Sequence, residues 1–388
     1  MVDLLAISHA SVLRINRRIY CELRARGWSV EIAVPDRYTT PAGESVPEPP
    51  APDDPPIHML PLRGTKIRFW RFPTLTALLQ KIRPRFVLLD GEPDSILAVL
   101  IGLALRRHGG KLIVQSCENL PQRFFGDLFA GRPARAARDL ALRLFLALAR
   151  PHIAHVLPIS SDGVRLMESL GFAGRITKTP LGYDQRLFFP DEKKRAEVRQ
   201  RLGLDQATVA YFGRPQPSKG IHLLVEALAG LSHVPFQFLL DSFSLYRSPY
   251  SLEIEALLQS TGVAARTVRF DATHEEMPDY MNATDIVAMP SITTPDWAEQ
   301  YGRVAPEAMA CGRTVVASDS GALPEVVADA GIVVPENNPA ALRAALEKAL
   351  TQPALREDYG RRAARRAVEE LSVPRQCDVL ERLLRNLN

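Results

Sequence analysis

Two cationic side chains stand close together in a turn that follows a predicted strand. Arg214 and Lys219 belong to the segment YFGRPQPSKG, whose glycines and prolines predict a turn that opens into a helix. Both cations can reach one anionic group there, because helix amino termini favour anions and ligands bind at the carboxyl ends of parallel strands. A solvated basic turn is the alternative, and the spacing alone does not separate the two.

Two carboxylates form a second candidate group in the segment PSITTPDWAEQYGRVAPEAMACG. Seven residues separate Glu299 from Glu307, and a Tyr301-Gly302 step lies between them. A helix that begins near Val304 would offer free backbone N–H groups to a phosphate or a sugar hydroxyl. Glu307 would then lie on that helix, where a carboxylate can accept the two vicinal hydroxyls of a ribose. Chance produces E-x7-E in any Glu-rich helix, so the specificity comes from the surrounding strand end, the YG step and the EAMACG continuation.

Short aliphatic runs alternate with helical patterns along the chain, which is typical of parallel α/β units. In the first half we expect strands at 3–8, 28–35, 57–60, 85–90, 111–116 and 154–160, with helices at 15–26, 74–82, 96–108, 132–150 and 162–170. In the second half we expect strands at 209–214, 236–241, 267–270, 286–290, 314–318 and 331–335, with helices beginning at Gly220, Leu252, Glu275, Val304 and Pro339. These two Rossmann-like halves predict domains at 1–182 and 183–355 and a helical tail at 356–388.

Composition and length indicate a globular protein of more than one domain. The 388 residues are 46% apolar and 24% charged, which excludes a disordered tail and a membrane-embedded protein. The longest apolar runs, such as 96–105, fall short of the roughly 20 residues that span a bilayer. The first residues lack a basic segment and an A-x-A site, so we expect no export and a cytoplasmic location. The four scattered cysteines indicate neither a disulfide framework nor a zinc site.

Several ligand-binding motifs are missing from the sequence. The first predicted strand is followed by SHASVLRIN rather than G-x-G-x-x-G, which disfavours NAD and FAD. No G-x-x-x-x-G-K-[ST] and no D-x-D occurs. The missing D-x-D favours neutralisation of a diphosphate by side chains and helix dipoles rather than by a metal ion. We therefore expect neither a metal nor a resident cofactor. Segment 41–56 holds seven prolines and predicts an extended surface loop.

The basic residues are unevenly placed along a chain of net charge +4. Seven Lys and Arg and no acid lie within 63–86, and nine Lys and Arg stand against three acids within 106–150. Such a basic surface suits a phospholipid, a nucleic acid or a phosphorylated substrate. The predicted helix 132–150 mixes leucines with five arginines and follows Phe124, Phe125, Leu128 and Phe129. It is either an interfacial membrane patch or a core-packed helix with a solvated arginine face.

Three segments together resemble the retaining family 4 glycosyltransferases of the GT-B fold: FGRPQPSKG, the PSITTP to GIVVP stretch quoted in part above, and PLGYDQRLFFP. The resemblance is closest over 179–350. It implies two Rossmann-like doubly wound domains that face a central cleft, with the acceptor on the first, the donor on the second, and a final helix that returns to the first. It also implies metal-independent transfer of a hexose from a UDP- or GDP-sugar to a glycan or lipid-linked acceptor. We then expect no nucleic-acid partner, because the acceptor or a membrane accounts for the basic surface.

The resemblance assigns expected roles to individual residues. Arg214 and Lys219 match the cations that neutralise the donor diphosphate, and with Glu299, which matches a carboxylate near the donor sugar, they form the expected catalytic group. Glu307 matches the ribose ligand. The other expected donor-binding residues are Gly213, Ala272, Thr273, Tyr301, Gly302, Arg303 and Val304. Retention in such enzymes is explained by front-face attack with the leaving phosphate as base, so we expect no protein nucleophile.

The sequence departs from the family pattern at three strand ends. The first loop carries SHAS where a Gly pair is common, CEN replaces a frequent His after the strand 111–116, and SFS replaces G-x-G after 236–241. His9, Glu118 and Asn119 are therefore candidates for acceptor or cleft contacts, with a core or loop-capping role as the alternative. Trp297 is expected to be a packing aromatic. The competing functions are a nucleotide-sugar epimerase on the same fold and a binding subunit without catalysis.

Overall fold

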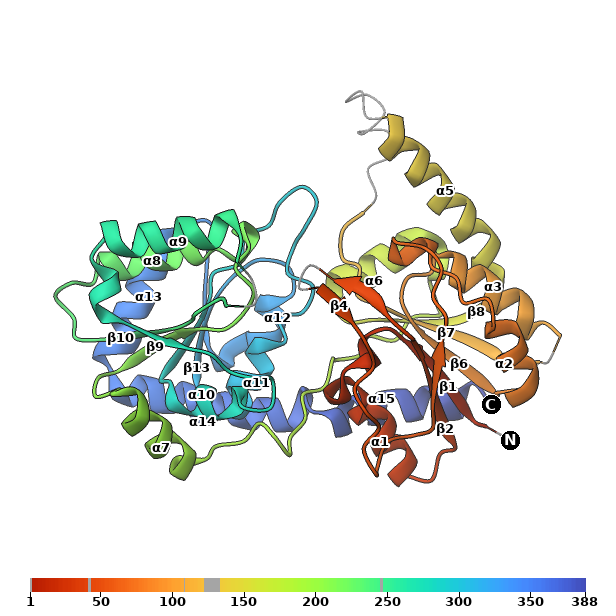
Figure 1. Ribbon diagram of the computed structural model, residues 1–388, viewed down its shortest axis with the longest axis horizontal. Coiled ribbons are helices and arrows are strands. Elements are labelled where there is room, and N and C mark those ends of the chain that lie inside the picture. The colour runs from red at the N-terminus through yellow and green to blue at the C-terminus, as the bar shows by residue number, and fades with distance from the viewer. Residues whose placement is uncertain (1, 41–42, 108, 122–132, 245–246) are drawn as a thin grey trace. The chain divides into compact units, whose positions relative to one another are not determined.

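The computed structural model describes residues 2–388 except 41–42, 108, 122–132 and 245–246. The chain divides into two compact units (Figure 1): unit 1 is Met1–Pro180 with Val373–Asn388, and unit 2 is Leu181–Ser372. We expected the domain boundary after residue 182, and unit 2 begins at Leu181. The expected tail 356–388 is divided, with 356–372 in unit 2 and 373–388 in unit 1. The aromatic residues Phe124, Phe125 and Phe129, with Leu128, lie outside the described residues.

Unit 1 is built on a six-stranded parallel sheet in the order β5-β2-β1-β6-β7-β8. Its strands are β1 (Leu4–Ser8), β2 (Val30–Pro35), β5 (Ile57–Leu60), β6 (Phe86–Asp90), β7 (Lys111–Ser116) and β8 (Ile153–Pro158). Its helices are α1 (Arg18–Ala25), α2 (Leu75–Ile82), α3 (Ile96–Leu105), α5 (Pro133–Ala149), α6 (Ser161–Met167) and α15 (Val373–Asn386). The order of the strands reverses between β1 and β6, which makes this the switch point of a doubly wound sheet.

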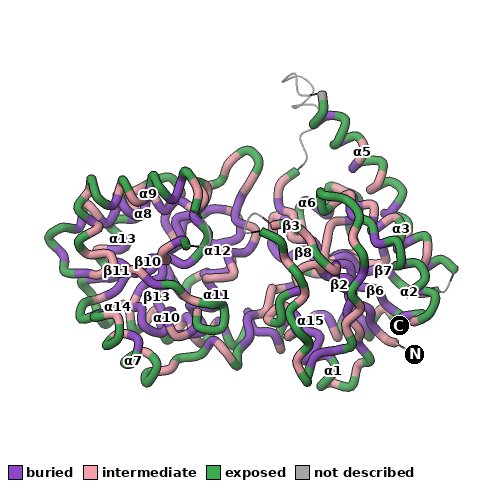
Figure 2. Tube along the Cα trace, viewed as in Figure 1, coloured by how far each residue is buried: buried purple, intermediate pink, exposed green. Residues whose placement is uncertain are grey.

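Different helices cover the two faces of the unit 1 sheet, as the alternation of side chains along a strand requires. Leu5 of β1 belongs to one core cluster, together with residues of α2 and α3 such as Ile101. Leu4 belongs to the other cluster, together with Leu23 of α1 and Leu384 of α15. Figure 2 shows the buried strands between more exposed helices. The last helix of the chain therefore completes the core of the first unit.

Unit 2 repeats this topology with the order β11-β10-β9-β12-β13-β14. Its strands are β9 (Thr208–Tyr211), β10 (Gln237–Asp241), β11 (Thr267–Phe270), β12 (Ile286–Met289), β13 (Thr314–Ser318) and β14 (Ile332–Val334). Its helices are α7 (Glu192–Leu202), α8 (Ile221–Ala229), α9 (Pro249–Ser260), α10 (Met277–Ala283), α11 (Val304–Ala310), α12 (Leu323–Val327), α13 (Pro339–Thr351) and α14 (Pro353–Glu370). The switch point lies between β9 and β12. The expected class, two doubly wound α/β sheets, is confirmed.

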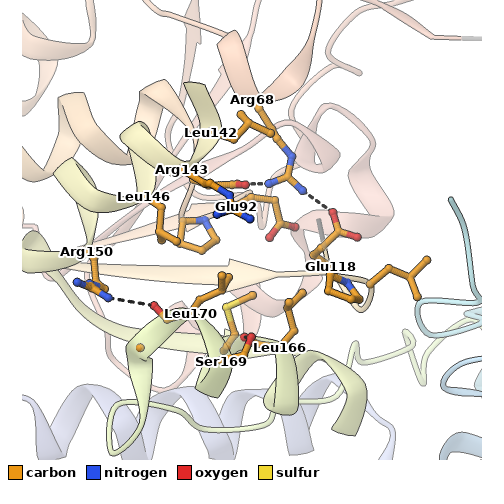
Figure 3. A pocket seen from close by; sticks show the side chains of 16 residues that line it. Arg68, Glu92, Glu118, Leu142, Arg143, Leu146, Arg150, Leu166, Ser169 and Leu170 are labelled. Carbon is orange, nitrogen blue, oxygen red and sulfur yellow. Dashed lines mark hydrogen bonds and ion pairs between the residues drawn. The ribbon is translucent and has the colours of Figure 1, made fainter. Parts of the chain in front are cut away.

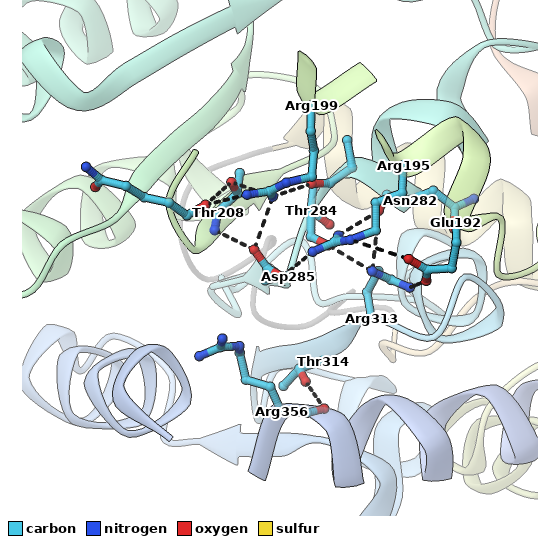
Figure 4. A network of polar contacts seen from close by, with 12 residues as sticks. Glu192, Arg195, Arg199, Thr208, Asn282, Thr284, Asp285, Arg313, Thr314 and Arg356 are labelled. Carbon is cyan, nitrogen blue, oxygen red and sulfur yellow. Dashed lines mark hydrogen bonds and ion pairs between the residues drawn. The ribbon is translucent and has the colours of Figure 1, made fainter. Parts of the chain in front are cut away.

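A polar network fixes α7 to the amino-terminal edge of the unit 2 sheet (Figure 4). Asp285, just before β12, accepts a hydrogen bond from the Thr208 backbone N–H at 2.8 Å and pairs with Arg195 at 2.6 Å. Arg199 lies 3.4 Å from the same carboxylate and donates to the Ala283 carbonyl at 3.0 Å. Ligands bind at the opposite, carboxyl edge of such sheets, so this network has a structural role.

The proline-rich segment 41–56 is only partly the surface loop that we expected. Its residues 43–45 form β4 (Gly43–Ser45), which pairs in an antiparallel hairpin with β3 (Tyr38–Thr40). Its end carries the buried Asp54, which forms a 2.7 Å ion pair with the fully buried Arg17. The prediction missed this because the partner of Asp54 lies 37 residues away in the sequence.

None of the helices in the described ranges is long and apolar enough to cross a membrane.

Candidate functional site

The switch point of unit 2 brings together two of the predicted catalytic side chains. Lys219 lies in the loop after β9 and Glu299 in the loop after β12, which is the neighbouring strand in the sheet. Lys219 Nζ lies 2.7 Å from Glu299 Oε2. The two loops are also joined through their backbones, since the N–H of Ile292 donates to the carbonyl of Ser218 at 2.7 Å. Parallel strands that are distant in sequence thus place the pair where α/β folds bind ligands.

Glu299 is a buried carboxylate with several neighbours. Only 6% of the residue is exposed, and its Oε2 atom also accepts a hydrogen bond from the Ser291 hydroxyl at 2.8 Å. The Lys219 ammonium lies 4.7 Å from the centre of the Trp297 ring, a cation–π distance. Trp297, which we expected only to pack, therefore helps to hold the cation. Ser291 and Trp297 thus each contact one member of the pair.

Two glycines allow the loops of this site to approach each other. Gly220 has φ of 67°, and a Cβ atom there would lie 1.9 Å from the carbonyl oxygen of Pro290. Gly321 has φ of 52°, and its Cβ would lie 2.1 Å from the carbonyl oxygen of Glu299. That carbonyl accepts a hydrogen bond from the Ala322 N–H at 2.9 Å. The backbone of Glu299 is thus fixed by the loop after β13.

Glu307 lies on α11, which begins at Val304 as predicted. The residue is 6% exposed, and its nearest described cation is Arg303, whose Nε lies 4.0 Å from Glu307 Oε1. Burial raises the pKa of Glu307 from its ordinary 4.5 to about 7, and Arg303 opposes this shift. Tyr301 and Gly302, between the two glutamates, are both buried. Burial of a carboxyl group with so distant a cation lowers the stability of the folded protein. Such unfavourable burial of an ionisable group is typical of binding sites.

The remaining donor-side predictions lie at the same edge of unit 2 but are more exposed. Gly213 and Arg214 follow β9 and are exposed, and the carbonyl of Arg214 accepts a hydrogen bond from the Tyr211 hydroxyl at 3.1 Å. Among the described residues, no carboxylate lies within ion-pair distance of the Arg214 guanidinium. Ala272 and Thr273 follow β11, and the Thr273 N–H and hydroxyl donate to Glu276. The structure does not bring Arg214 into contact with the Lys219–Glu299 pair.

The switch point of unit 1 holds His9, one of the predicted acceptor-side residues. Ser8, at the end of β1, donates a hydrogen bond to Asp90 Oδ2 at 2.8 Å, and His9 Nδ1 lies 3.7 Å from the same oxygen. The His9 ring also makes edge contacts with Tyr38 and Trp70, with centroids 6.2 and 5.8 Å away. Asp90, which we did not predict as a site residue, ends β6. A polar residue that ends an aliphatic strand is the signal that could have found it.

The other two acceptor-side candidates follow β7. Glu118 accepts a hydrogen bond from Arg68, which also donates to Asp94. Asn119 is buried. The sequence reasoning missed Arg68, Glu92 and Asp94 as site residues, although the segment DGEPD begins at the last residue of a predicted strand and places three acids at or just after the carboxyl end of that strand.

Metal-binding geometry occurs once in the part of the chain that the structure describes. The potential ligand atoms of Cys21, Asp53 and Asp54 lie within 4.8 Å of one another. Asp54 pairs with Arg17 at 2.7 Å and Asp53 with Arg18 at 2.5 Å. Because each carboxylate already has a guanidinium partner, this group serves to anchor the proline-rich segment.

Two doubly wound parallel sheets in one chain are the architecture of the GT-B fold. The chain matches the family described as "Glycosyl transferases group 1" over residues 192–366 and the "Glycosyl transferase 4-like domain" over residues 12–182. Together these matches take in most of the chain, and the chain belongs to the group 1 glycosyltransferase family. The family predicted from the FGRPQPSKG and EQYGRVAPEAMACG segments is confirmed.

Individual relatives either match only part of this chain or share few of its residues. The chain is 35% identical over 204 residues to a D-inositol 3-phosphate glycosyltransferase from Jonesia denitrificans, which is 49% of this chain and 46% of that protein. The matched part thus spans about half the length of this curated relative. A sucrose-phosphate synthase from Thermosynechococcus elongatus has the same fold, with a TM-score of 0.73 at 23% identity over 100% of this chain and 99% of that one. HepE of Anabaena, solved with UDP and glucose, gives a TM-score of 0.74 at 18% identity over 100% of both chains.

Proposed function

We propose that this protein is a retaining, metal-independent glycosyltransferase that moves a hexose from a UDP- or GDP-sugar to a glycan or lipid-linked acceptor. The observation that carries the proposal is the 2.7 Å Lys219–Glu299 pair at the switch point of unit 2. Membership of the glycosyltransferase family supports the reaction class. The UDP and glucose bound to a protein of the same fold support a nucleotide-sugar donor. We place this activity in the cytoplasm, where such donors are made, and in the synthesis of polysaccharides or glycolipids.

In the proposed reaction, the acceptor hydroxyl oxygen forms a bond to the anomeric carbon of the donor. The bond between that carbon and the diphosphate oxygen breaks, and its electron pair leaves with the nucleoside diphosphate. The hydroxyl proton passes to the leaving phosphate, so no protein nucleophile is required. Lys219 has three N–H donors, and the bond to Glu299 leaves two for phosphate oxygens. Arg214, exposed on the same edge, provides a second cation for the charge that develops.

The carboxylates have separate roles in this proposal. Glu299, held by Ser291 and Lys219, accepts hydrogen bonds from hydroxyls of the donor sugar. Glu307 accepts the ribose hydroxyls of the nucleotide, and backbone N–H groups between Tyr301 and Val304 hold sugar or phosphate oxygens. Gly213, Ala272 and Thr273 complete the donor contacts. In this proposal Lys219 and Arg214 donate hydrogen bonds to the diphosphate directly, in place of a divalent cation.

We also propose that α5 docks unit 1 on an anionic membrane, where a lipid-linked acceptor would reside. Leu140, Leu144 and Leu148 are 59%, 57% and 50% exposed and repeat every four residues, so they form one apolar stripe. Arg135 and Arg138 are exposed on the same helix, whereas its acid, Asp139, is buried. Exposed leucines beside arginines are typical of helices that lie in a membrane interface.

A panel of nucleotide sugars tests the proposed function. UDP-, GDP- and ADP-sugars are incubated with the protein, with and without EDTA, and melting temperature and release of nucleoside diphosphate are measured. We expect one donor to raise the melting temperature and to be turned over at the same rate in EDTA. Glu307→Ala should weaken binding of the nucleoside diphosphate about tenfold or more, because each lost hydroxyl contact costs about 1 kcal/mol or more. Conversion of the donor sugar without acceptor would indicate the epimerase, and binding without turnover would indicate the non-catalytic subunit.

A further inference from the structure

A pocket of about 450 Å³ lies within unit 1, at the carboxyl edge of its sheet (Figure 3). The loops that follow β6 and β7 form one side of it, and α5 with residues 166–171 forms the other. This volume is suited to a small-molecule ligand. The pocket is part of the same strand-end region as Asp90, the partner of His9, which ends β6.

One end of the pocket is rich in hydrogen-bond acceptors. Three carboxyl groups, those of Glu92, Asp94 and Glu118, surround the guanidinium of Arg68. Arg68 donates to both Asp94 and Glu118, so its positive charge is already balanced. Burial raises the pKa of Glu92 to about 8, against the opposing effect of Arg68. This end therefore offers carboxylate oxygens that can accept hydrogen bonds from the hydroxyl groups of a ligand.

The opposite wall of the pocket is apolar. Leu142 and Leu146 reach it from α5, and Leu166, Met167 and Leu170 reach it from the segment that follows β8. Two of these side chains, Leu146 and Leu170, are only half-buried in the protein. Water on these leucines is displaced favourably by any apolar group that covers them. Two further arginines, Arg143 and Arg150, line the pocket, and Arg150 donates to the carbonyl of Leu170 at 3.5 Å.

We propose that this pocket binds the acceptor of the transfer reaction and that the acceptor is a glycoside with an apolar aglycone. Its sugar hydroxyls donate to the carboxylates of Asp94 and Glu118, and its aglycone covers Leu146 and Leu170. The proposal rests on the proposed glycosyltransferase function and names the chemical class of its acceptor. A small acceptor without an apolar group, such as inositol phosphate, the substrate in the name of the curated relative, would leave these leucines uncovered.

Binding of simple glycosides tests this proposal without requiring turnover. Hexyl and methyl glycosides of the common hexoses, and inositol phosphate, are titrated into the wild-type protein by calorimetry in the absence of donor. We expect a hexyl glycoside to bind at least about tenfold more tightly than its methyl counterpart, because each buried CH₂ contributes about 0.8 kcal/mol. Equal affinity for both glycosides, or tighter binding of inositol phosphate, would overturn the proposal.

Two neighbouring substitutions locate the binding site. Ser169 lines the pocket and is exposed, so Ser169→Trp should fill the pocket with little effect on folding. Glu168 is also exposed but does not line the pocket, so Glu168→Trp is the matched control. We expect Ser169→Trp to abolish the preference for the hexyl glycoside and Glu168→Trp to keep it. If both variants keep the preference, the glycoside binds elsewhere and the proposal fails.

The proposed function and this inference can fail separately. The thermal shift by UDP or GDP reports on the proposed donor site of unit 2 and does not require an acceptor. Normal donor binding together with no glycoside binding would overturn the pocket assignment and leave the glycosyltransferase proposal standing. The protein could instead bind a glycoside, lose that binding in Ser169→Trp, and turn over no nucleotide sugar. This result would support the pocket assignment and contradict the glycosyltransferase proposal.

Discussion

Lys219 Nζ and Glu299 Oε2 lie 2.7 Å apart although 80 residues separate them in the chain. The contact bridges the loops that follow β9 and β12, which are adjacent only because the strand order of unit 2 reverses there. Ser291 donates a hydrogen bond to Glu299, and Trp297 contacts Lys219. The site is therefore a product of sheet topology rather than of a local motif.

Lys219→Ala should lower turnover about 100-fold or more, because it removes a cation from the charge that develops on the leaving diphosphate. It also removes the Lys219 ion pair of the buried Glu299 carboxylate, so we expect a lower melting temperature. Adding Glu299→Gln should restore the melting temperature and not the turnover. Lys193→Ala, at an 86% exposed position of α7, is the control for loss of a lysine. Normal turnover in Lys219→Ala would remove Lys219 from the diphosphate site.

Glu307→Gln should stabilise the protein above pH 7 and have no such effect below pH 4.5. The pKa of Glu307 is raised to about 7 in the folded state, so the unfolded chain releases this proton first as pH rises. The free energy of unfolding of the wild type therefore falls as the pH rises from 4.5 to 7, by about 3 kcal/mol for a pKa shift of this size. Urea unfolding at pH 4.5 and pH 8 measures the difference, with Glu226→Gln on the exposed side of α8 as control. An equal effect of Glu307→Gln at both pH values would contradict the assigned pKa.

Gly321→Ala should destabilise unit 2 and reduce turnover, because its Cβ would lie 2.1 Å from the carbonyl oxygen of Glu299. Gly262→Ala provides a matched control, since Gly262 also has a positive φ, of 74°, but has no atom within 4 Å of an added Cβ. We expect the control to cost about 1 kcal/mol of unfolding free energy for the backbone conformation alone. Denaturant unfolding and donor turnover of both variants should show a larger loss for Gly321→Ala. Equal losses in the two variants would mean that the close approach of Gly321 to the Glu299 carbonyl contributes nothing to stability or turnover.

Leu144→Glu should weaken binding to vesicles that contain an anionic lipid. Leu144 lies in the middle of the exposed stripe of α5, and a carboxylate there opposes both insertion and the attraction of the nearby arginines. Leu252→Glu on α9 is the control, because Leu252 is also 57% exposed but belongs to unit 2. Cosedimentation should fall about tenfold for the first variant and stay at the wild-type level for the second. Unchanged cosedimentation of Leu144→Glu would exclude α5 as the membrane contact.

The fold was largely predictable because each central strand is a short aliphatic run between helical patterns. The strands β6, β7 and β11 lie within the expected ranges, and α11 begins at Val304 as expected. The hairpin of β3 and β4 was missed because its strands are three residues long and lie beside a proline-rich segment. Short strands of this kind carry too few residues for a period of two to be seen.

The candidate site was predictable in its residue types but not in its pairings. Lys219 and Glu299 were both expected near a donor, yet their contact depends on which strands are neighbours in the sheet. Arg68 was seen only as part of a basic run, whereas in the fold it joins Asp94 and Glu118, which are 26 and 50 residues away. The charge of a segment therefore says little about the charge of the pocket that it lines.

The position of α15 has a consequence for the order in which the protein folds. Leu380, Leu383 and Leu384 of this helix complete the core of unit 1, and Cys377 donates a hydrogen bond to the Ile19 carbonyl at 3.3 Å. Domains generally fold as they leave the ribosome, amino-terminal ones first. Unit 1 is the exception here: most of it is synthesised first, but its core stays open until α15 has followed the whole of unit 2. Unit 2 is thus the first part of this chain that can reach its final structure, and unit 1 must wait with the part of its core that α15 covers still exposed.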